Sequence, residues 1–300
     1  MKPCNIFQLQ RLSVNDGEGI RTTVFFKGCH LRCRWCANPE SWRFEAQLMY
    51  LPHKCCHCGR CADICPAKAN TLSKDGALYF NSALCRLCGR CITACPMQAR
   101  QQLGEQLSVQ EVINEIKKDY LFYMESGGGV TFSGGEPYLH PQYLRELADC
   151  CHRLGINTCT ESCGYFDFEQ CKDIIAAMDA LFFDIKLMDS AKHKHYTGQP
   201  NAVILSNISK AAKINSHITI RVPVIKDVND DLQNMQLLCQ FLTQNTNIKH
   251  IELLTYHKLG VEKMTALGLP AQVFQPPEEH RLTKLKEIIT SYGLTNISYK

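Results

Sequence analysis

Outside residues 49–100, short apolar runs rich in β-branched and aromatic residues alternate with longer stretches whose apolar residues recur at helical spacing. Because strands that alternate with helices form parallel sheets covered by helices, we expect an α/β fold, a partial (β/α)6 barrel. Ser108 and Glu111 have the spacing of a capping box, which predicts a helix from there to about Met124. The short runs predict strands at residues 22–26, 129–132, 157–160, 180–185, 218–223 and 250–254. The longer stretches predict helices at residues 142–154, 168–178, 202–214, 232–244 and 278–292.

Polar or reactive side chains lie at the carboxyl ends of these predicted strands. Active sites of α/β barrels gather at that end, so several such strand ends together predict an active site. A single polar residue at one strand end is more often a helix cap or a satisfied polar group. In chain order the residues are Cys29, Cys33, Cys36, Ser133, Glu136, Glu161, Ser162, Asp184, Lys186, Arg221, Tyr256, His257 and Lys258.

The first strand is followed by a three-cysteine run, in which Cys29, Cys33 and Cys36 have the spacing C-x3-C-x2-C. Three close thiolates can hold three irons of a [4Fe-4S] cluster and leave the fourth iron open, whereas electron-transfer clusters use four thiolates. An open iron beside a strand end favours an enzyme. The alternatives are free thiols or a zinc site, for which His30 would supply a further ligand.

Residues 49–100 contain an internal repeat, because residues 55–66 and 85–96 both read C-x2-C-x2-C-x3-C-P. This is the bacterial ferredoxin run, in which the fourth cysteine of each motif ligates the other cluster. We therefore expect a ferredoxin-like domain with two [4Fe-4S] clusters, inserted into a barrel of residues 1–48 and 101–300. Zinc is again the alternative, and the repeat disfavours it. The first predicted ligand set is Cys55, Cys58, Cys61 and Cys95, and the second is Cys65, Cys85, Cys88 and Cys91.

The 19 cysteines thus divide into eleven predicted cluster ligands and eight others. In a chain of 300 residues with 45% hydrophobic content, this usage indicates a reducing, oxygen-poor cytoplasm rather than a disulfide scaffold. We expect the other eight to be small buried residues or idle thiols. They are Cys4, Cys56, Cys150, Cys151, Cys159, Cys163, Cys171 and Cys239.

The formal net charge of +4 falls to about −1 once the thiolates of three bound clusters are counted. No block of Lys or Arg indicates binding to nucleic acid or to an anionic membrane surface. No apolar run reaches the roughly 18 residues of a membrane span, and residues 1–12 lack the apolar core of a signal peptide. We therefore expect a cytoplasmic protein without membrane or nucleic-acid partners, and we expect it to be a monomer.

A glycine-rich segment, residues 127–129 with Gly134 and Gly135, could cradle a phosphate. It lacks the sequence of a P-loop and that of a dinucleotide-binding fold. We interpret it as a close approach of the backbone to a ligand, with Glu136 offering a carboxylate to a cationic group such as an amine. The alternative is an ordinary glycine turn.

Together these segments resemble the radical S-adenosylmethionine (SAM) superfamily and, more narrowly, the activating enzymes of glycyl radical enzymes of the pyruvate formate-lyase activator type. The insert is similar to that in activators of glycerol dehydratase, choline lyase, hydroxyproline dehydratase and arylacetate decarboxylase-type enzymes. The resemblance rests on residues 16–23, 28–42, 126–137, 184–186, 221–225 and 253–260, and on Lys263.

The resemblance implies a reaction. A donor such as flavodoxin or ferredoxin reduces the cluster of the three-cysteine run, which passes one electron to SAM bound at the open iron. Cleavage gives methionine and a 5′-deoxyadenosyl radical. That radical takes a hydrogen atom from the Cα of one glycine in a partner glycyl radical enzyme. The protein would thus be a radical SAM oxidoreductase.

The resemblance also implies roles for single residues. The three-cysteine run and Lys186 would be catalytic, and Trp35 would lie near the adenine. Asp16 would lie near the glycine loop of the partner. The amino group of SAM would be received by Gly134, Gly135 and Glu136. The positions expected near the methionine carboxylate, a monovalent cation and the ribose are Glu161, Ser162, Asp184, Lys186, Arg221 and His257.

Two other functions stay open. The chain could be a radical SAM enzyme that acts on a small molecule or on another protein residue, and radical formation without a glycyl radical partner would favour this. It could also be an electron-transfer protein that uses the barrel as a scaffold, which predicts no SAM cleavage under dithionite. The three-cysteine run and Glu136 argue against the second alternative.

Overall fold

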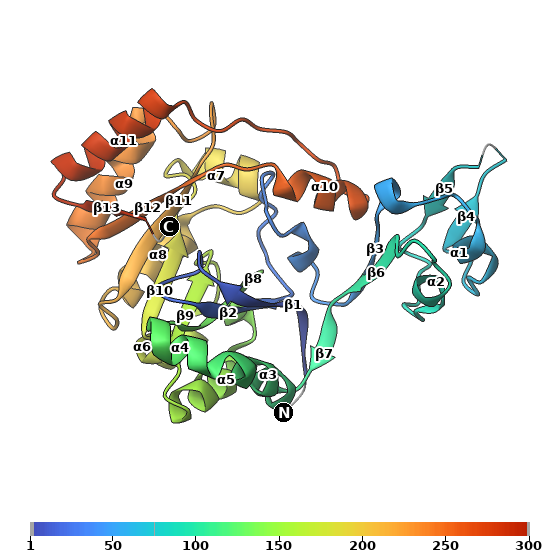
Figure 1. Cartoon of the computed structure of the whole chain (residues 1–300). Helices are drawn as coiled ribbons and strands as arrows, with labels where there is room; N and C mark the ends of the chain where they lie inside the picture. The colour runs from blue at the N-terminus through green and yellow to red at the C-terminus, as the bar shows by residue number, and fades with distance from the viewer. Residues whose placement is uncertain (1–2, 75, 299–300) are drawn as a thin grey trace.

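The computed structural model describes residues 3–74 and 76–298, and a nine-stranded sheet forms its centre (Figure 1). The strand order is β13-β12-β11-β10-β9-β8-β2-β1-β7. Strands β13 to β2 in this order are parallel neighbours, whereas β1 pairs antiparallel with both β2 and β7. The predicted α/β fold with a mainly parallel sheet is thereby confirmed.

All six predicted strands are present, each within two residues of its predicted ends. They are β2 (Arg21–Phe26), β8 (Gly129–Gly134), β9 (Asn157–Ser162), β10 (Ala180–Asp184), β11 (Ile218–Val224) and β12 (His250–Thr255). The sequence analysis did not predict the three remaining strands of this sheet, of which β7 and β13 are its two edges and β1 lies next to β7. These are β1 (Cys4–Ser13), β7 (Glu105–Leu107) and β13 (Thr295–Ile297).

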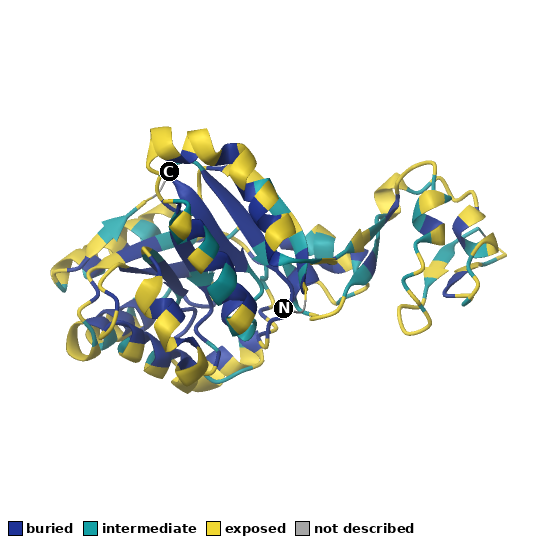
Figure 2. Ribbon diagram, turned by 90° about the horizontal axis from the view of Figure 1, so that it is seen from below, coloured by how far each residue is buried: buried dark blue, intermediate teal, exposed yellow. Residues whose placement is uncertain are grey.

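The predicted helices cover the sheet, with their buried faces toward the strands and their exposed faces outward (Figure 2). The prediction of five helices is confirmed, although α8 ends three residues early. They are α5 (Pro141–Arg153), α6 (Phe168–Ala177), α8 (Ala202–Ala211), α9 (Leu232–Asn245) and α11 (Glu279–Ser291). Outside residues 49–100, the prediction also omitted the two short helices α7 (Ser190–Thr197) and α10 (Leu259–Ala266).

The prediction of one continuous helix from Ser108 to Met124 is wrong. The capping box is present, but α3 (Val109–Ile116) is followed by a 3-10 turn and then by α4 (Tyr120–Ser126). The turn contains Asp119, whose buried carboxylate accepts hydrogen bonds from Thr22 at 2.8 Å and from Arg11 at 3.0 Å. The break aims this carboxylate at β1 and β2, a contact that the local sequence pattern does not contain.

A two-stranded ribbon, β3 (Gln47–Tyr50) with β6 (Arg100–Leu103), leads out of the sheet to a segment that projects to one side (Figure 1). The boundaries expected at residues 48–49 and 100–101 fall within this ribbon. The repeat is also visible in the backbone, because equivalent residues have nearly equal positive φ angles, such as 75° at Gly59 and 74° at Gly89. The elements of the segment are the 3-10 turn Pro52–Lys54, α1 (Arg60–Asp63), β4 (Asn70–Leu72), β5 (Leu78–Phe80) and α2 (Arg90–Thr93).

Among residues 3–74 and 76–298, we find no helix with the length and apolar character needed to span a membrane.

Candidate active site and cysteine clusters

The loop after β2, which carries the three-cysteine run, is joined to the glycine loop after β8. The Glu136 N–H donates a hydrogen bond to the Gly28 carbonyl at 2.8 Å, and the Gly135 N–H donates to Phe26 at 2.9 Å. A Cβ at Gly135 would lie 2.2 Å from the Gly28 oxygen, so only glycine permits this approach. The structure therefore brings together two segments that lie about a hundred residues apart in the sequence.

Helix α10 closes another side of the three-cysteine run. A Cβ at Gly260 would lie 1.9 Å from the Cys36 carbonyl oxygen, so the helix can approach only at a glycine. Lys263 Nζ lies 2.6 Å from Glu40 Oε1 and 3.0 Å from Asn38 Oδ1, in the turn that follows the run. Because the Glu40 side chain is almost fully buried, this ion pair fixes the turn. The sequence analysis did not identify Glu40.

Glu136 is completely buried beside the three-cysteine run. Its carboxylate accepts hydrogen bonds from the Ser162 hydroxyl at 2.9 Å and from the Cys163 and Tyr138 N–H groups at 2.8 and 3.3 Å. Burial raises the pKa of Glu136 to about 7, and hydrogen bonds from Cys163 and Ser162 oppose that shift. The structure thus holds a buried, preorganised carboxyl group beside the three-cysteine run, and its binding of a cationic ligand group stays a prediction.

Cys163 is a site residue that the sequence analysis missed. It is buried, as predicted for the remaining cysteines, but its thiol also contacts Cys29, and this hydrogen bond lowers the pKa of Cys29. The signal that could have identified it is its position directly after Glu161 and Ser162 at the end of β9. Of the other seven cysteines in that group, Cys56 is exposed and Cys150 is half-buried.

Lys186 brings a positive charge to the same thiols. It is 7% exposed, and its Nζ lies 2.7 Å from Asp184 Oδ2. Burial opposes the charged form of Lys186, but the Asp184 carboxylate, followed by Cys33 and Cys163, raises its pKa overall. In turn, burial raises the pKa of Cys33, and the Lys186 charge opposes that shift. Lys186 therefore stays protonated beside the three-cysteine run.

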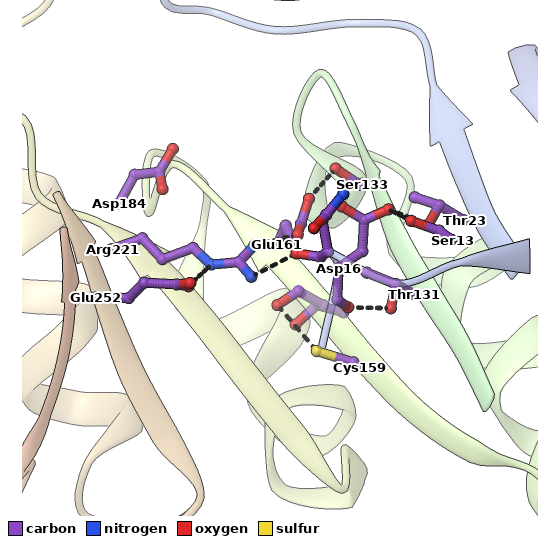
Figure 3. A network of polar contacts seen from close by, with 12 residues as sticks. Ser13, Asp16, Thr23, Thr131, Ser133, Cys159, Glu161, Asp184, Arg221 and Glu252 are labelled. Carbon is purple, nitrogen blue, oxygen red and sulfur yellow. Dashed lines mark hydrogen bonds and ion pairs between the residues drawn. The ribbon is translucent and has the colours of Figure 1, made fainter. Parts of the chain in front are cut away.

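A second polar network crosses the interior of the sheet (Figure 3). Arg221 forms ion pairs with Glu161 and with Glu252, the latter at 2.7 Å, and Ser133 donates to Glu161 at 2.5 Å. Burial raises the pKa of Glu161, and Arg221 opposes this shift. The sequence analysis assigned Arg221 to a ligand, whereas here it also neutralises two carboxylates, one of which, Glu252, it had not named.

The loop between β1 and β2 reaches into this network and places Asp16 there. The Asp16 carboxylate accepts hydrogen bonds from Ser13 at 2.6 Å and from Thr23 at 2.5 Å (Figure 3). Its backbone carbonyl accepts a bond from Thr131, and the neighbouring Asn15 carbonyl accepts one from Arg221. Asp16 is therefore held near the strand interior, and its predicted contact with a partner stays a prediction.

The predicted adenine neighbour, Trp35, lies in an aromatic group. Its ring centroid is 5.8 Å from that of Tyr196 and 5.9 Å from that of Phe274. His257 follows β12 and is exposed, so it does not join the buried network. His30, the alternative zinc ligand, is also exposed and packs against aromatic rings, among them Phe44.

The cysteines of the projecting segment gather around two cavities. One cavity is lined by all four residues of the first ligand set and the other by all four of the second. The chain thus carries the fourth cysteine of each motif to the cavity of the other motif. Within the described residues, no group of three or more His, Cys, Asp or Glu residues is arranged to hold a single metal ion.

Backbone N–H groups point at sulfur atoms in both halves of this segment. The His57 and Leu87 N–H groups donate to the Cys55 and Cys85 sulfurs at 3.4 and 3.5 Å. The same pairing recurs at the fourth cysteines, where Ala69 N–H donates to Cys65 at 3.2 Å and Ala99 N–H donates to Cys95 at 3.3 Å. Hydrogen bonds of this kind stabilise thiolates that hold iron–sulfur clusters.

Comparisons with known proteins agree with this fold and site. The model of the radical SAM superfamily matches residues 23–238. A choline trimethylamine-lyase activating enzyme of Oleidesulfovibrio alaskensis is 41% identical over 268 residues, 88% of this chain and 86% of that protein. A trans-4-hydroxy-L-proline dehydratase activating enzyme of Clostridioides difficile is 38% identical over 288 residues, 94% and 95% of the two chains.

A radical SAM methyltransferase from Sphaerobacter thermophilus shares the fold, with a TM-score of 0.51 at 14% identity over 71% of this chain and 61% of that one. The fold and the matched family model define a radical SAM protein. With the two activating enzymes added, the chain belongs to the radical SAM superfamily and, within it, to the activating enzymes of glycyl radical enzymes.

Proposed function

We propose that this protein activates a glycyl radical enzyme and that the three-cysteine run holds the [4Fe-4S] cluster at which SAM binds. The observation that carries the proposal is the convergence of Glu136 and Lys186 on this run, from the ends of two other strands. When bound, the cluster supplies one electron for cleavage of SAM into methionine and a 5′-deoxyadenosyl radical, which takes hydrogen from a glycine Cα of the partner.

The residues of this chain bind and orient SAM in the proposal. Glu136, with Gly134 and Gly135, receives the amino group, and Lys186 pairs with the carboxylate. The buried, hydrogen-bonded carboxylate of Glu136 supports the first role, and the buried charge of Lys186 beside the thiols supports the second. The aromatic group around Trp35 supports an apolar place for the adenine.

The remaining predicted residues surround the methionine and ribose parts of SAM. Asp184, Arg221 and His257 belong to this set, with Glu161 and Ser162. A monovalent cation would take its ligands from Glu161, Ser162 and Asp184. Because Arg221 already pairs with Glu161, the cation would share that carboxylate with a guanidinium.

We further propose that residues 49–100 form a ferredoxin-like domain with two [4Fe-4S] clusters, inserted into the barrel of residues 1–48 and 101–300. The two cavities, each lined by one predicted ligand set, support this division, as do the repeated N–H···S hydrogen bonds. Flavodoxin or ferredoxin would be the electron donor, in a reducing cytoplasm, and the protein would act as a monomer. Asp16 would contact the partner.

The test is anaerobic incubation of the reconstituted protein with SAM and dithionite. We expect 5′-deoxyadenosine and methionine in equal amounts. A glycyl radical doublet should appear in the EPR spectrum once a partner enzyme is added, and it should be absent when the partner's glycine is replaced by alanine. Cleavage of SAM coupled to turnover of a small molecule, with no protein radical, would instead favour a different radical SAM activity.

A further inference from the structure

Arg100, at the start of β6, is a buried cation without a conventional partner. It is 1% exposed, and none of its three side-chain nitrogens has a hydrogen-bond partner among residues 3–74 and 76–298. Its guanidinium lies over the rings of Tyr50 and Phe80, at 4.2 and 5.1 Å from their centroids. Burial of a charge is unfavourable unless an opposite charge compensates it, so this guanidinium needs a negative group.

The surroundings of Arg100 indicate where that negative group belongs. Arg100 lines the cavity of the first ligand set, together with Tyr50. All four cysteines of the first ligand set line this same cavity. The guanidinium therefore lies where thiolates would gather.

The internal repeat allows Arg100 to be compared with the residue at the equivalent position of the first motif. Arg100 is five residues after Cys95, and the equivalent position in the first motif, five residues after Cys65, is occupied by Asn70. Asn70 is also buried, and it lines the cavity of the second ligand set. At this equivalent position the first cavity is lined by a buried guanidinium and the second by a buried neutral amide, whereas Arg86, which also lines the second cavity, is exposed to solvent.

We propose that Arg100 raises the reduction potential of the cluster held by the first ligand set above that of the cluster held by the second. This inference rests on the proposed two-cluster function of the insert. The external donor loses one electron and the cluster gains it, so the total charge of the cluster with its four thiolates becomes one unit more negative. The Arg100 guanidinium stabilises that added charge in a buried setting, where Coulomb attraction is weakly screened. The neutral Asn70 amide lacks this effect.

The electron would reside preferentially at the first cavity, and the second would be the better reductant of the pair. One side chain would thus give the two clusters different reduction potentials. Reduction potentials of iron–sulfur clusters respond to net charge and to hydrogen bonds at the sulfurs, which are the two properties that Arg100 changes.

The test is an EPR-monitored redox titration of the full chain in a Cys33→Ala background, which removes the signal of the third cluster. Two midpoints are expected in that parent protein. Arg100→Asn gives both motifs the same residue at this position and removes the buried charge, so the upper midpoint should fall toward the lower one. A tenfold fall in the ratio of reduced to oxidised cluster at fixed potential is a shift of about 59 mV for one electron. Arg100→Lys keeps a positive charge and should keep most of the separation. Asn70→Arg should raise the lower midpoint.

Unchanged midpoints in Arg100→Asn would overturn the inference, as would equal shifts in Arg100→Asn and Arg100→Lys. If Arg100→Asn loses iron and Arg100→Lys keeps it, the need for the charge is supported. If both lose iron, Arg100 acts through its shape and the inference is wrong. The parent protein should hold about eight irons in two clusters. If it holds none in the insert, the proposed function of the insert fails, whereas eight irons with unmoved midpoints overturn only the role of Arg100.

Discussion

The cysteines beside the sheet and those in the insert are both proposed as ligands of iron–sulfur clusters, but they have different surroundings. The three-cysteine run lies among ionisable side chains, namely Glu136, Lys186 and Cys163. The two ligand sets of the insert lie mainly among backbone N–H groups, with Arg100 as the buried charge. Three thiols with polar groups nearby suit the binding of a ligand, and four thiols with backbone donors suit electron transfer. The groups around the sulfurs, as well as the number of sulfurs, therefore distinguish the two sites.

The largest effect is expected from a substitution in the three-cysteine run beside the sheet. Cys33→Ala should abolish SAM cleavage, because two thiolates cannot hold the open cluster, and iron should fall from about twelve to about eight per chain. The measurements are iron content and 5′-deoxyadenosine formed under dithionite. The control is Cys239→Ala, at a buried cysteine in α9, which should keep its iron and its cleavage. Full cleavage by Cys33→Ala would contradict the assignment.

The next largest effect is expected from a substitution of one cysteine in the insert. Cys88→Ala should still cleave SAM with dithionite, because the proposed SAM-binding cluster is held by the separate three-cysteine run. It should fail with flavodoxin or ferredoxin, or fail to activate the partner, if the insert relays electrons or forms a docking surface. Cleavage and glycyl radical yield are measured side by side with each reductant. Cys56→Ala is the matched control, since this exposed cysteine lines the cavity of the first ligand set without belonging to it. Wild-type behaviour of Cys88→Ala in every assay would mean that the insert has no part in the reaction.

A smaller effect is expected from a substitution of Glu136, an ionisable group beside the three-cysteine run. Glu136→Ala should weaken SAM binding about ten- to a hundredfold, since a hydrogen bond to a charged group contributes roughly 1.5–3 kcal/mol. Iron content should not change. Equilibrium binding of SAM measures the effect, and Glu125→Ala, at an exposed position on α4, is the control. Unaltered affinity in Glu136→Ala would place the amino group of SAM elsewhere.

The smallest effect concerns the support of the three-cysteine run. Lys263→Met should lower the free energy of unfolding by about 1 kcal/mol, because it leaves the buried Glu40 carboxylate without its cation. Urea unfolding of the cluster-free protein measures it. Lys210→Met removes an exposed ion pair with Glu169 and should change stability by less than about 0.5 kcal/mol. Equal effects of the two substitutions would show that the pair with Glu40 is unimportant.

The main strands could be predicted because each is a short β-rich run between glycine-containing turns and amphipathic helices, a signal that lies within the element itself. Strand β1 was missed because much of it is exposed although it pairs with β2 and β7, so its sequence CNIFQLQRLS lacks the continuous apolar run of the buried strands. Helix α7 was missed because its sequence is mostly polar. The break at Asp119 depends on contacts with Arg11 and Thr22, about a hundred residues away.

The candidate site shows the same division. The spacing of the cysteines carried enough information to predict two crossed ligand sets, and one cavity is lined by each. The contact of Cys163 with Cys29 and the pairing of Arg221 with Glu252 join different strands, so no local pattern contains them. The burial of Arg100 is equally invisible in the sequence, where it is one more arginine after a proline-containing turn.

The ribbon of β3 and β6 has a consequence for how such a chain could evolve. Gln47 and Leu103 are direct partners in its register, so the backbone departs and returns about 4.5–5.5 Å apart. The residues between Gln47 and Leu103 could be deleted and replaced by a two-residue turn without changing the order of the strands in the main sheet. Because each cavity is lined by the fourth cysteine of the other motif, half of the excised piece would complete neither proposed ligand set. We therefore expect the segment between Gln47 and Leu103 to be gained or lost as one unit.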